Sequence, residues 1–221
     1  MKHAAIRDLY EYWDRLRGRG AAPERDAIEP GPIRRVLADT FILGFDPGMG
    51  HPVRLAGTRV CAIFARELKG EAFLKLWDKD SRASMRDLFS VVTGEAVAVA
   101  AGAIGQTLGG KRLDLEMLIL PLAHQGRLDA RVLGALLPAA PPYWLGIDPV
   151  DKLTLGALRY VSEPREAASL PRRSAVAASL APSLSPMRGT PDVPALAHAP
   201  GGRIRRGLIV YDGGKKEFSD S

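Results

Sequence analysis

Leu113-Asp114-Leu115-Glu116-Met117-Leu118-Ile119-Leu120, residues 113–120 of this 221-residue chain, is the stretch that sets the fold class. Its odd-numbered positions are all apolar. Because a β-strand points alternate side chains to one face, the stretch is predicted to be a strand with one apolar face. The opposite face begins with Asp114 and Glu116 and becomes apolar at Leu118 and Leu120. The strand is therefore expected to lie in a sheet that packs on a core.

A further strand is predicted on each side of this stretch. The Val- and Ala-rich residues 95–104 precede it across a Gly-Gly turn. Residues 128–136, which alternate between apolar and other side chains, follow it after a turn at 124–127. Three strands joined by short glycine-containing turns predict an antiparallel meander. The apolar stretch at 153–161 is expected to extend this sheet or to pack across it.

The first half of the folded region is predicted to hold two strands followed by helices. Residues 40–45 and 51–55 are expected to pair as a hairpin, because the Asp-Pro-Gly sequence between them strongly favours a turn. A short buried turn is expected at 73–77. The predicted helices cover residues 58–69 and 81–93, with Asp80 or Ser81 as the N-terminal cap of the second.

The N-terminal segment carries the clearest helical pattern. Apolar side chains recur on one helical face at positions 6, 9, 10, 13 and 16, with charged residues between them. This apolar stripe must be covered, either by the domain that follows it or by a second copy of the chain, and the pattern leaves both alternatives open. The predicted interaction residues on the stripe are Leu9, Trp13 and Leu16.

The chain is expected to divide into three segments. Residues 1–36 are the N-terminal helix and a linker, residues 37–161 form the folded domain, and residues 162–221 are a tail. The tail scatters prolines among Ala, Ser and Arg without a periodic apolar face, so it is predicted to be disordered. Within the tail, residues 208–211 are either a docking strand or an exposed end.

Composition indicates a cytoplasmic protein with a hydrophobic core. Hydrophobic residues make up 46% of the chain and charged residues 25%. No apolar run reaches the roughly 20 residues that cross a bilayer, and the charged N-terminal segment lacks the apolar stretch of a secretory signal. Because Cys61 is the only cysteine, an intramolecular disulfide is excluded. The chain is therefore expected to have no membrane partner.

The predicted order of elements resembles that of a PAS domain, an α/β (α+β) fold with a five-stranded antiparallel sheet and helices on one face. Residues 62–70 (AIFARELKG) are similar to the PAS pattern of an apolar helix that leads into Glu-Leu-x-Gly. The chain also resembles a bacterial family of stand-alone PAS-like proteins, formerly catalogued as a domain of unknown function. The motifs that carry this resemblance are 12–17 (YWDRLR), 22–25 (APER), 53–59 (VRLAGTR), 67–70 (ELKG), 76–77 (LW), 116–122 (EMLILPL), 133–135 (LGA) and 143–146 (YWLG).

The resemblance implies a regulatory role and a pocket between the sheet and its helices, where apolar walls can hold a small molecule. Aromatic and methionine side chains at strand or helix spacing are equally compatible with a plain core. The predicted walls are Phe64, Trp77, Phe89, Leu115, Met117 and Val132.

Glu116 is the predicted polar group of this pocket, since a buried carboxylate requires a partner. Arg54 or Arg59 is expected to supply that partner, or the two arginines together bind an anionic ligand. The alternative is that Glu116 lies on a solvated face of the sheet.

The sequence assigns no cofactor and favours no enzyme class. Haem requires an axial ligand, usually histidine, and the helix predicted at 81–93 contains none. Cys61 lies in Arg-Val-Cys-Ala-Ile-Phe, which departs from the cysteine motif of photoreceptive flavin-binding PAS domains. Gly-x-Gly-x-x-Gly and His-Glu-x-x-His are absent from the sequence. The chain is therefore expected not to be an enzyme.

Three functions follow from these observations. The first is a cytoplasmic sensory or adaptor protein that acts in signal transduction through protein contacts, with the N-terminal helix as a possible homodimer interface. The second is a regulator that binds a small metabolite in the PAS pocket. The third, nucleic-acid binding through arginines 172, 173, 203, 205 and 206, is disfavoured because no aromatic residues are interleaved with them.

Overall fold

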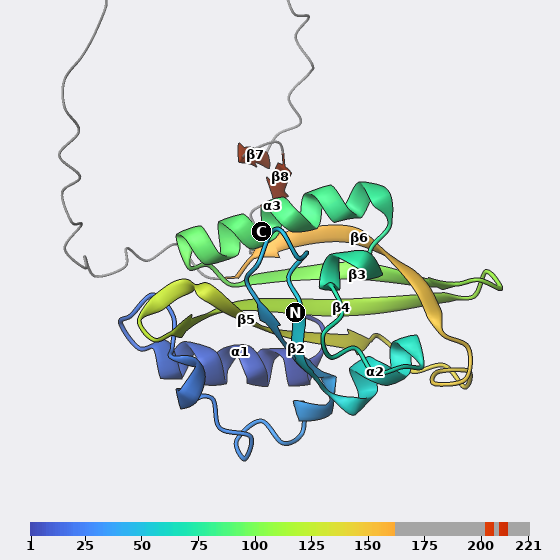
Figure 1. The fold of residues 1–221 in the computed structure, drawn as a ribbon, viewed down its shortest axis with the longest axis horizontal. Helices are drawn as coiled ribbons and strands as arrows, with labels where there is room; N and C mark the ends of the chain where they lie inside the picture. The colour runs from blue at the N-terminus through green and yellow to red at the C-terminus, as the bar shows by residue number, and fades with distance from the viewer. Residues whose placement is uncertain (162–201, 206–207, 212–221) are drawn as a thin grey trace, which may run out of the picture.

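The computed structural model describes residues 1–161, 202–205 and 208–211. Residues 1–161 are built on one antiparallel sheet. Its strands are β1 (Thr40–Gly44), β2 (Val53–Ala56), β3 (Val99–Thr107), β4 (Arg112–His124), β5 (Arg127–Pro138) and β6 (Val150–Tyr160). In space they follow the order β2-β1-β5-β4-β3-β6 (Figure 1). The hairpin of β1 and β2 and the meander of β3, β4 and β5 confirm the predictions from sequence.

The predicted apolar stretch at 153–161 extends the sheet. It lies in β6, which pairs antiparallel with β3 from Val150 to Tyr160. The sheet therefore has the five expected strands and a sixth at its edge. This strand gives β3 a partner on both sides, so the edge strands of the sheet are β2 and β6.

Three helical elements cover one face of the sheet: α2 (Thr58–Phe64), the 3₁₀ turn η3 (Phe73–Leu76) and α3 (Lys79–Glu95). The predicted extent of α2 was too long, because Ala65 adopts a left-handed conformation (φ 49°) that ends the helix. The cap of α3 is Asp78, not Asp80 or Ser81, and its carboxylate accepts the N–H of Ser81 at 2.7 Å.

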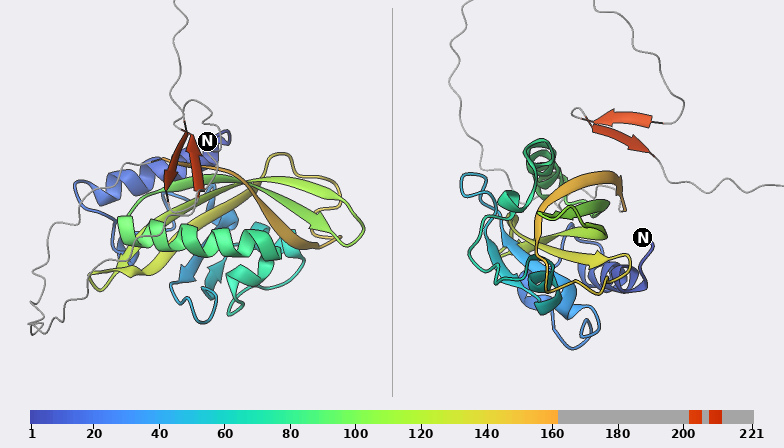
Figure 2. Two further views of the ribbon diagram at one scale, coloured as in Figure 1. Left: turned by 90° about the horizontal axis from the view of Figure 1, so that it is seen from above. Right: turned by 90° about the vertical axis from the view of Figure 1, so that its right-hand side faces the viewer.

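The helix α1 (Ala4–Arg17) covers the opposite face of the sheet (Figures 1 and 2). The sheet therefore has two cores, one on each face. On β4 the odd-numbered side chains enter the core on the α3 side, whereas the apolar even-numbered side chains enter the core under α1. The members contributed by β4 to the core under α1 are Leu118, Leu120 and Leu122.

The segment predicted as helix and linker, residues 1–36, is attached to the domain along its length. After α1 the chain crosses to β4, where the N–H of Ala123 donates to the carbonyl oxygen of Pro23 at 2.9 Å. Two 3₁₀ turns, η1 (Arg25–Ala27) and η2 (Leu37–Asp39), then lead into β1.

Most of the tail, residues 162–201, 206–207 and 212–221, lies outside the described residues, and with it the prediction of disorder and most of the arginines considered for nucleic-acid binding. Two described pieces, β7 (Gly202–Arg205) and β8 (Leu208–Tyr211), pair antiparallel with each other. Residues 208–211, predicted to be either a docking strand or an exposed end, therefore form a strand, as their β-branched and aromatic residues favour. No helix in the described residues is long and apolar enough to cross a membrane.

Candidate functional site

The predicted pocket walls all lie in the core between the sheet and α2, η3 and α3. The structure brings the six side chains into one packed cluster in which none is more than 4% exposed. Phe64, Trp77 and Phe89 come from the helical layer, whereas the other three come from β4 and β5. This is the position that the PAS resemblance implied for a ligand.

A series of aromatic contacts runs through this core. The ring of His51 lies 4.9 Å from that of Phe45 and 4.7 Å from that of Phe89. Phe73 connects Phe89 to Trp77, with ring centroids separated by 5.8 Å and 6.0 Å. His51 is the one member with a titratable side chain, and no sequence pattern marked it as a site residue.

The imidazole of His51 is buried and neutral. The backbone of His51 adopts the left-handed conformation (φ 59°). Its Nδ1 accepts the backbone N–H of Asp46 at 3.2 Å. The ring proton therefore resides on Nε2, which is buried without a hydrogen-bond partner among the described residues. Burial lowers the pKa of His51 to about 4, and the positive charge of Arg86 acts in the same direction, against the raising effect of Asp46.

Trp77 carries a second buried donor. Its indole N–H is fully buried and has no partner among the described residues. An unsatisfied buried donor costs about 1–3 kcal/mol. The core thus contains two buried N–H donors that have no partner among the described residues. Across the described residues, no group of three His, Cys, Asp or Glu side chains is placed to hold a metal ion.

Glu116 lies outside this core, and its partner differs from the prediction. It lies on the α1 side of β4, where its carboxylate accepts the backbone N–H groups of Lys2 at 2.8 Å and His3 at 2.7 Å. These amides immediately precede α1, so the carboxylate lies at the positive end of the helix dipole. Glu116 therefore anchors α1 and is not a polar wall of the pocket.

The two arginines proposed as partners of Glu116 are elsewhere. Arg59, on α2, forms an ion pair with the buried carboxylate of Asp39, with Nε and Oδ1 2.8 Å apart. Arg54, on β2, lines a surface depression together with Arg25 and Arg131. The expected pairing of Glu116 with either arginine is therefore wrong.

The predicted interaction residues on α1 differ in their exposure to solvent. Leu9 and Trp13 are fully buried against the sheet, and the indole N–H of Trp13 donates to the carbonyl oxygen of Pro121 at 2.9 Å. Leu16 is 37% exposed. Of the two alternatives left open by the apolar stripe, the structure has the helix covering its own domain. Leu9 and Trp13 are not accessible to a partner while α1 is docked.

The strand order 2-1-5-4-3, with the helical elements inserted between the second and third strands, is the arrangement expected of a PAS domain. The sequence profile of the PAS domain family matches residues 1–137. This chain belongs to the PAS domain family. The match includes α1, so the helix on the second face of the sheet is part of the PAS unit. PAS domains are general sensory and ligand-binding modules, and the prediction of a PAS-like family is confirmed.

The chain is also similar to solved structures at low sequence identity. One is the PAS domain, in complex with ethanol, of a LuxR-family transcriptional regulator from Burkholderia thailandensis, with 16% sequence identity, a TM-score of 0.37 and coverage of 48% of this chain and 94% of that chain. Another is a light-oxygen-voltage (LOV) protein from Rhodobacter sphaeroides, with 12% identity, a TM-score of 0.38 and coverage of 52% and 71%. A search of curated proteins gave no match.

Proposed function

We propose that this PAS protein is a cytoplasmic sensory adaptor that acts in signal transduction by binding partner proteins and not by catalysis. The observation that supports this is the attachment of α1 to an apolar face of the sheet. PAS domains are sensory modules, and a sensory module needs a surface whose accessibility can change. The face under α1 is such a surface.

Two residues of β4 make polar contacts that hold α1 on this face. Glu116 binds the amides that precede the helix, and Pro121 accepts the indole N–H of Trp13. Both acceptors belong to β4, so a shift of this strand alters both contacts at once. The opposite side of β4 lines the core that contains Met117. A change in that core therefore reaches the α1 contacts through a single strand.

Release of α1 would uncover a surface suited to protein binding. The side chains beneath it are aliphatic, and burial of apolar area contributes about 25 cal/mol per Å². Exposed apolar faces of this kind mark protein interaction sites. The partner is a signalling protein or a second copy of the chain. The residues that the sheet and the residue before β3 contribute are Ile42, Ala98, Ala100, Leu118, Leu120, Leu122, Leu133, Ala135 and Leu137.

The replacement Glu116→Ala tests this proposal. It removes two charge-assisted hydrogen bonds, which typically contribute about 1.5–3 kcal/mol. We expect the released fraction of α1 to rise about 10- to 100-fold. Since the uncovered face then becomes available to a second copy, sedimentation velocity should show stronger self-association than in the wild type.

Asp114→Ala is the matched control, because Asp114 lies two residues away on the same face of β4 and pairs with the exposed Arg112. This variant should sediment as the wild type does. A Glu116→Ala protein whose helix is released but whose association state is unchanged would contradict the proposal.

A second function, regulation by a small metabolite, is favoured by the unsatisfied donors of His51 and Trp77 in the core. It predicts that protein purified without added ligand retains a molecule that denaturation releases, seen as extra mass in native mass spectrometry. His51→Phe, which keeps a ring but removes the donor, should lose that mass. A wild-type mass equal to that of the bare chain would count against this function.

A further inference from the structure

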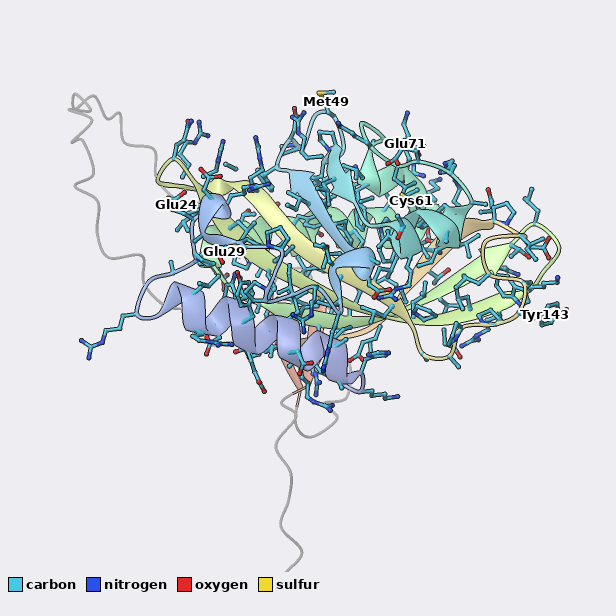
Figure 3. All side chains as sticks on the ribbon, turned by 90° about the horizontal axis from the view of Figure 1, so that it is seen from below. Glu24, Glu29, Met49, Cys61, Glu71 and Tyr143 are labelled. Carbon is cyan, nitrogen blue, oxygen red and sulfur yellow. The ribbon has the colours of Figure 1, made fainter. Side chains whose placement is uncertain are left out.

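We propose that the depression lined by Arg25, Arg54 and Arg131 is a binding site for a small phosphate monoester. It has a volume of about 320 Å³, and its other lining residues are Ile42 and Leu55. It lies at the β2–β1–β5 side of the sheet, separate from the PAS core. Figure 3 shows Glu24, which immediately precedes η1 and its Arg25, near the end of the sheet where β4 turns into β5, and its carboxylate accepts the N–H of Gly126.

The backbone brings the three arginines together from separate elements. Arg25 belongs to η1, Arg54 to β2 and Arg131 to β5. Gly44 of β1 lies between the last two, because it pairs directly with Arg131 and a Cβ atom at Gly44 would lie 2.9 Å from Nε of Arg54. Directly paired residues place their side chains on the same face about 5 Å apart at Cβ. The guanidinium of Arg54 therefore lies across Gly44 and next to Arg131.

The positive charges in the depression are poorly compensated. Arg25 has one carboxylate nearby, that of the exposed Asp26 at 3.6 Å. Arg131 donates to the backbone carbonyl oxygen of Ala130 at 2.8 Å. Among the described side chains, no carboxylate lies within ion-pair distance of Arg54 or Arg131. Two adjacent cations repel each other, and an anion that bridges them relieves this repulsion.

The chemistry of the lining residues indicates the class of ligand. Guanidinium groups bind planar or tetrahedral oxyanions through paired hydrogen bonds, and a dianion matches a site with more than one cation. The remaining wall is apolar, with Ile42 nearly buried and Leu55 43% exposed at the rim. The volume is at the small end of the range for small-molecule sites. A phosphate monoester with a compact apolar group matches both the arginine side and the apolar side of the depression.

Isothermal titration calorimetry of the full chain with phenyl phosphate tests the proposal. We expect binding that weakens as salt is added, because the charges are exposed. Arg54→Gln and Arg131→Gln should each weaken the affinity by about tenfold or more, since each removes a charge-assisted contact. Arg159→Gln is the control: Arg159 is exposed on β6, at the opposite edge of the sheet, and its replacement should leave the affinity unchanged.

The ligand class is tested with inorganic phosphate, benzoate and an oligoglutamate peptide. If inorganic phosphate and benzoate bind more weakly than phenyl phosphate, the result supports a ligand whose phosphate contacts the arginines and whose apolar group contacts Ile42 and Leu55. The proposal is overturned if phenyl phosphate does not bind or if the arginine variants bind it normally. It is also overturned if only the peptide binds, which would make the depression a protein contact. Urea unfolding of each variant verifies that the fold is retained.

Discussion

Replacing Trp13 with Ala should lower the free energy of unfolding by about 3–5 kcal/mol, the usual cost of removing a buried tryptophan side chain. Trp13 is fully buried beneath the sheet, its indole donates to Pro121, and the guanidinium of Arg17 lies 4.6 Å from its ring centroid. The substitution leaves a cavity and deprives the Pro121 carbonyl oxygen of its donor. Urea unfolding of the two proteins measures the difference.

Leu16→Ala provides the comparison for this substitution, because Leu16 lies on the same helix but is 37% exposed. Its replacement should cost about 1 kcal/mol or less. If α1 were a dimer interface instead of a cover for its own sheet, Trp13→Ala would weaken association and leave the stability of the monomer nearly unchanged. That pattern, measured by sedimentation and urea unfolding together, would refute the placement of α1.

Lowering the pH from 7 to 4 should cost the folded state about 3 kcal/mol through His51 alone. The pKa of His51 is about 4 in the folded protein, against 6.5 for an unperturbed histidine, because burial disfavours the charged ring. Between these two values the unfolded chain binds a proton that the folded protein excludes. This contribution to stability is therefore fully present above pH 6.5 and is lost as the pH falls toward 4.

His51→Phe isolates this effect, since it keeps an aromatic ring between Phe45 and Phe89 but removes the titratable group. Urea unfolding at pH 7, 5.5 and 4 should show the wild type losing stability relative to the variant by about 3 kcal/mol. Other groups that titrate in this range affect both proteins and cancel in the difference. A difference that does not change with pH would show that His51 is not held neutral in the core.

The strand content and the pairing of strands that are neighbours in sequence could be predicted because these patterns are local. Alternation over residues 113–120 and the glycine-containing turns on each side depend on the two-residue period of a strand alone. The core positions Leu115, Met117 and Val132 follow from the same alternation. The alternation does not show whether these residues line a cavity, because a packed core and a pocket wall use the same residue types.

The position of α1 could not be derived from its own amphipathic stripe, which is the same for a helix on its own sheet and for a helix on a partner. The second face of β4 carries the informative signal. It becomes apolar at Leu118 and Leu120, and these side chains require a cover. Reading the two patterns together would have predicted α1 on this face.

Sequence patterns identify charged partners poorly when the partner is the backbone. Glu116 binds the backbone amides of Lys2 and His3. Because every residue except proline carries a backbone N–H, the residue types in the sequence do not reveal this partner. His51 was missed for a related reason: it lies in a turn, and its burial depends on the left-handed backbone that folds it under Phe89. That Arg131 shares a face with Gly44 can be inferred only when the register between β1 and β5 is known.

Exchange of the Trp13 indole proton with solvent, followed by NMR in heavy water, tests most directly whether α1 is a releasable cover. The indole signals can be assigned by replacing each tryptophan with phenylalanine in turn. We expect slow exchange of the Trp13 proton in the wild type and in Asp114→Ala, and exchange about 10- to 100-fold faster in Glu116→Ala. The signal of Trp77 should not respond to Glu116→Ala. Exchange of the wild-type Trp13 proton at the rate of a free indole, or no response to Glu116→Ala, would contradict the account.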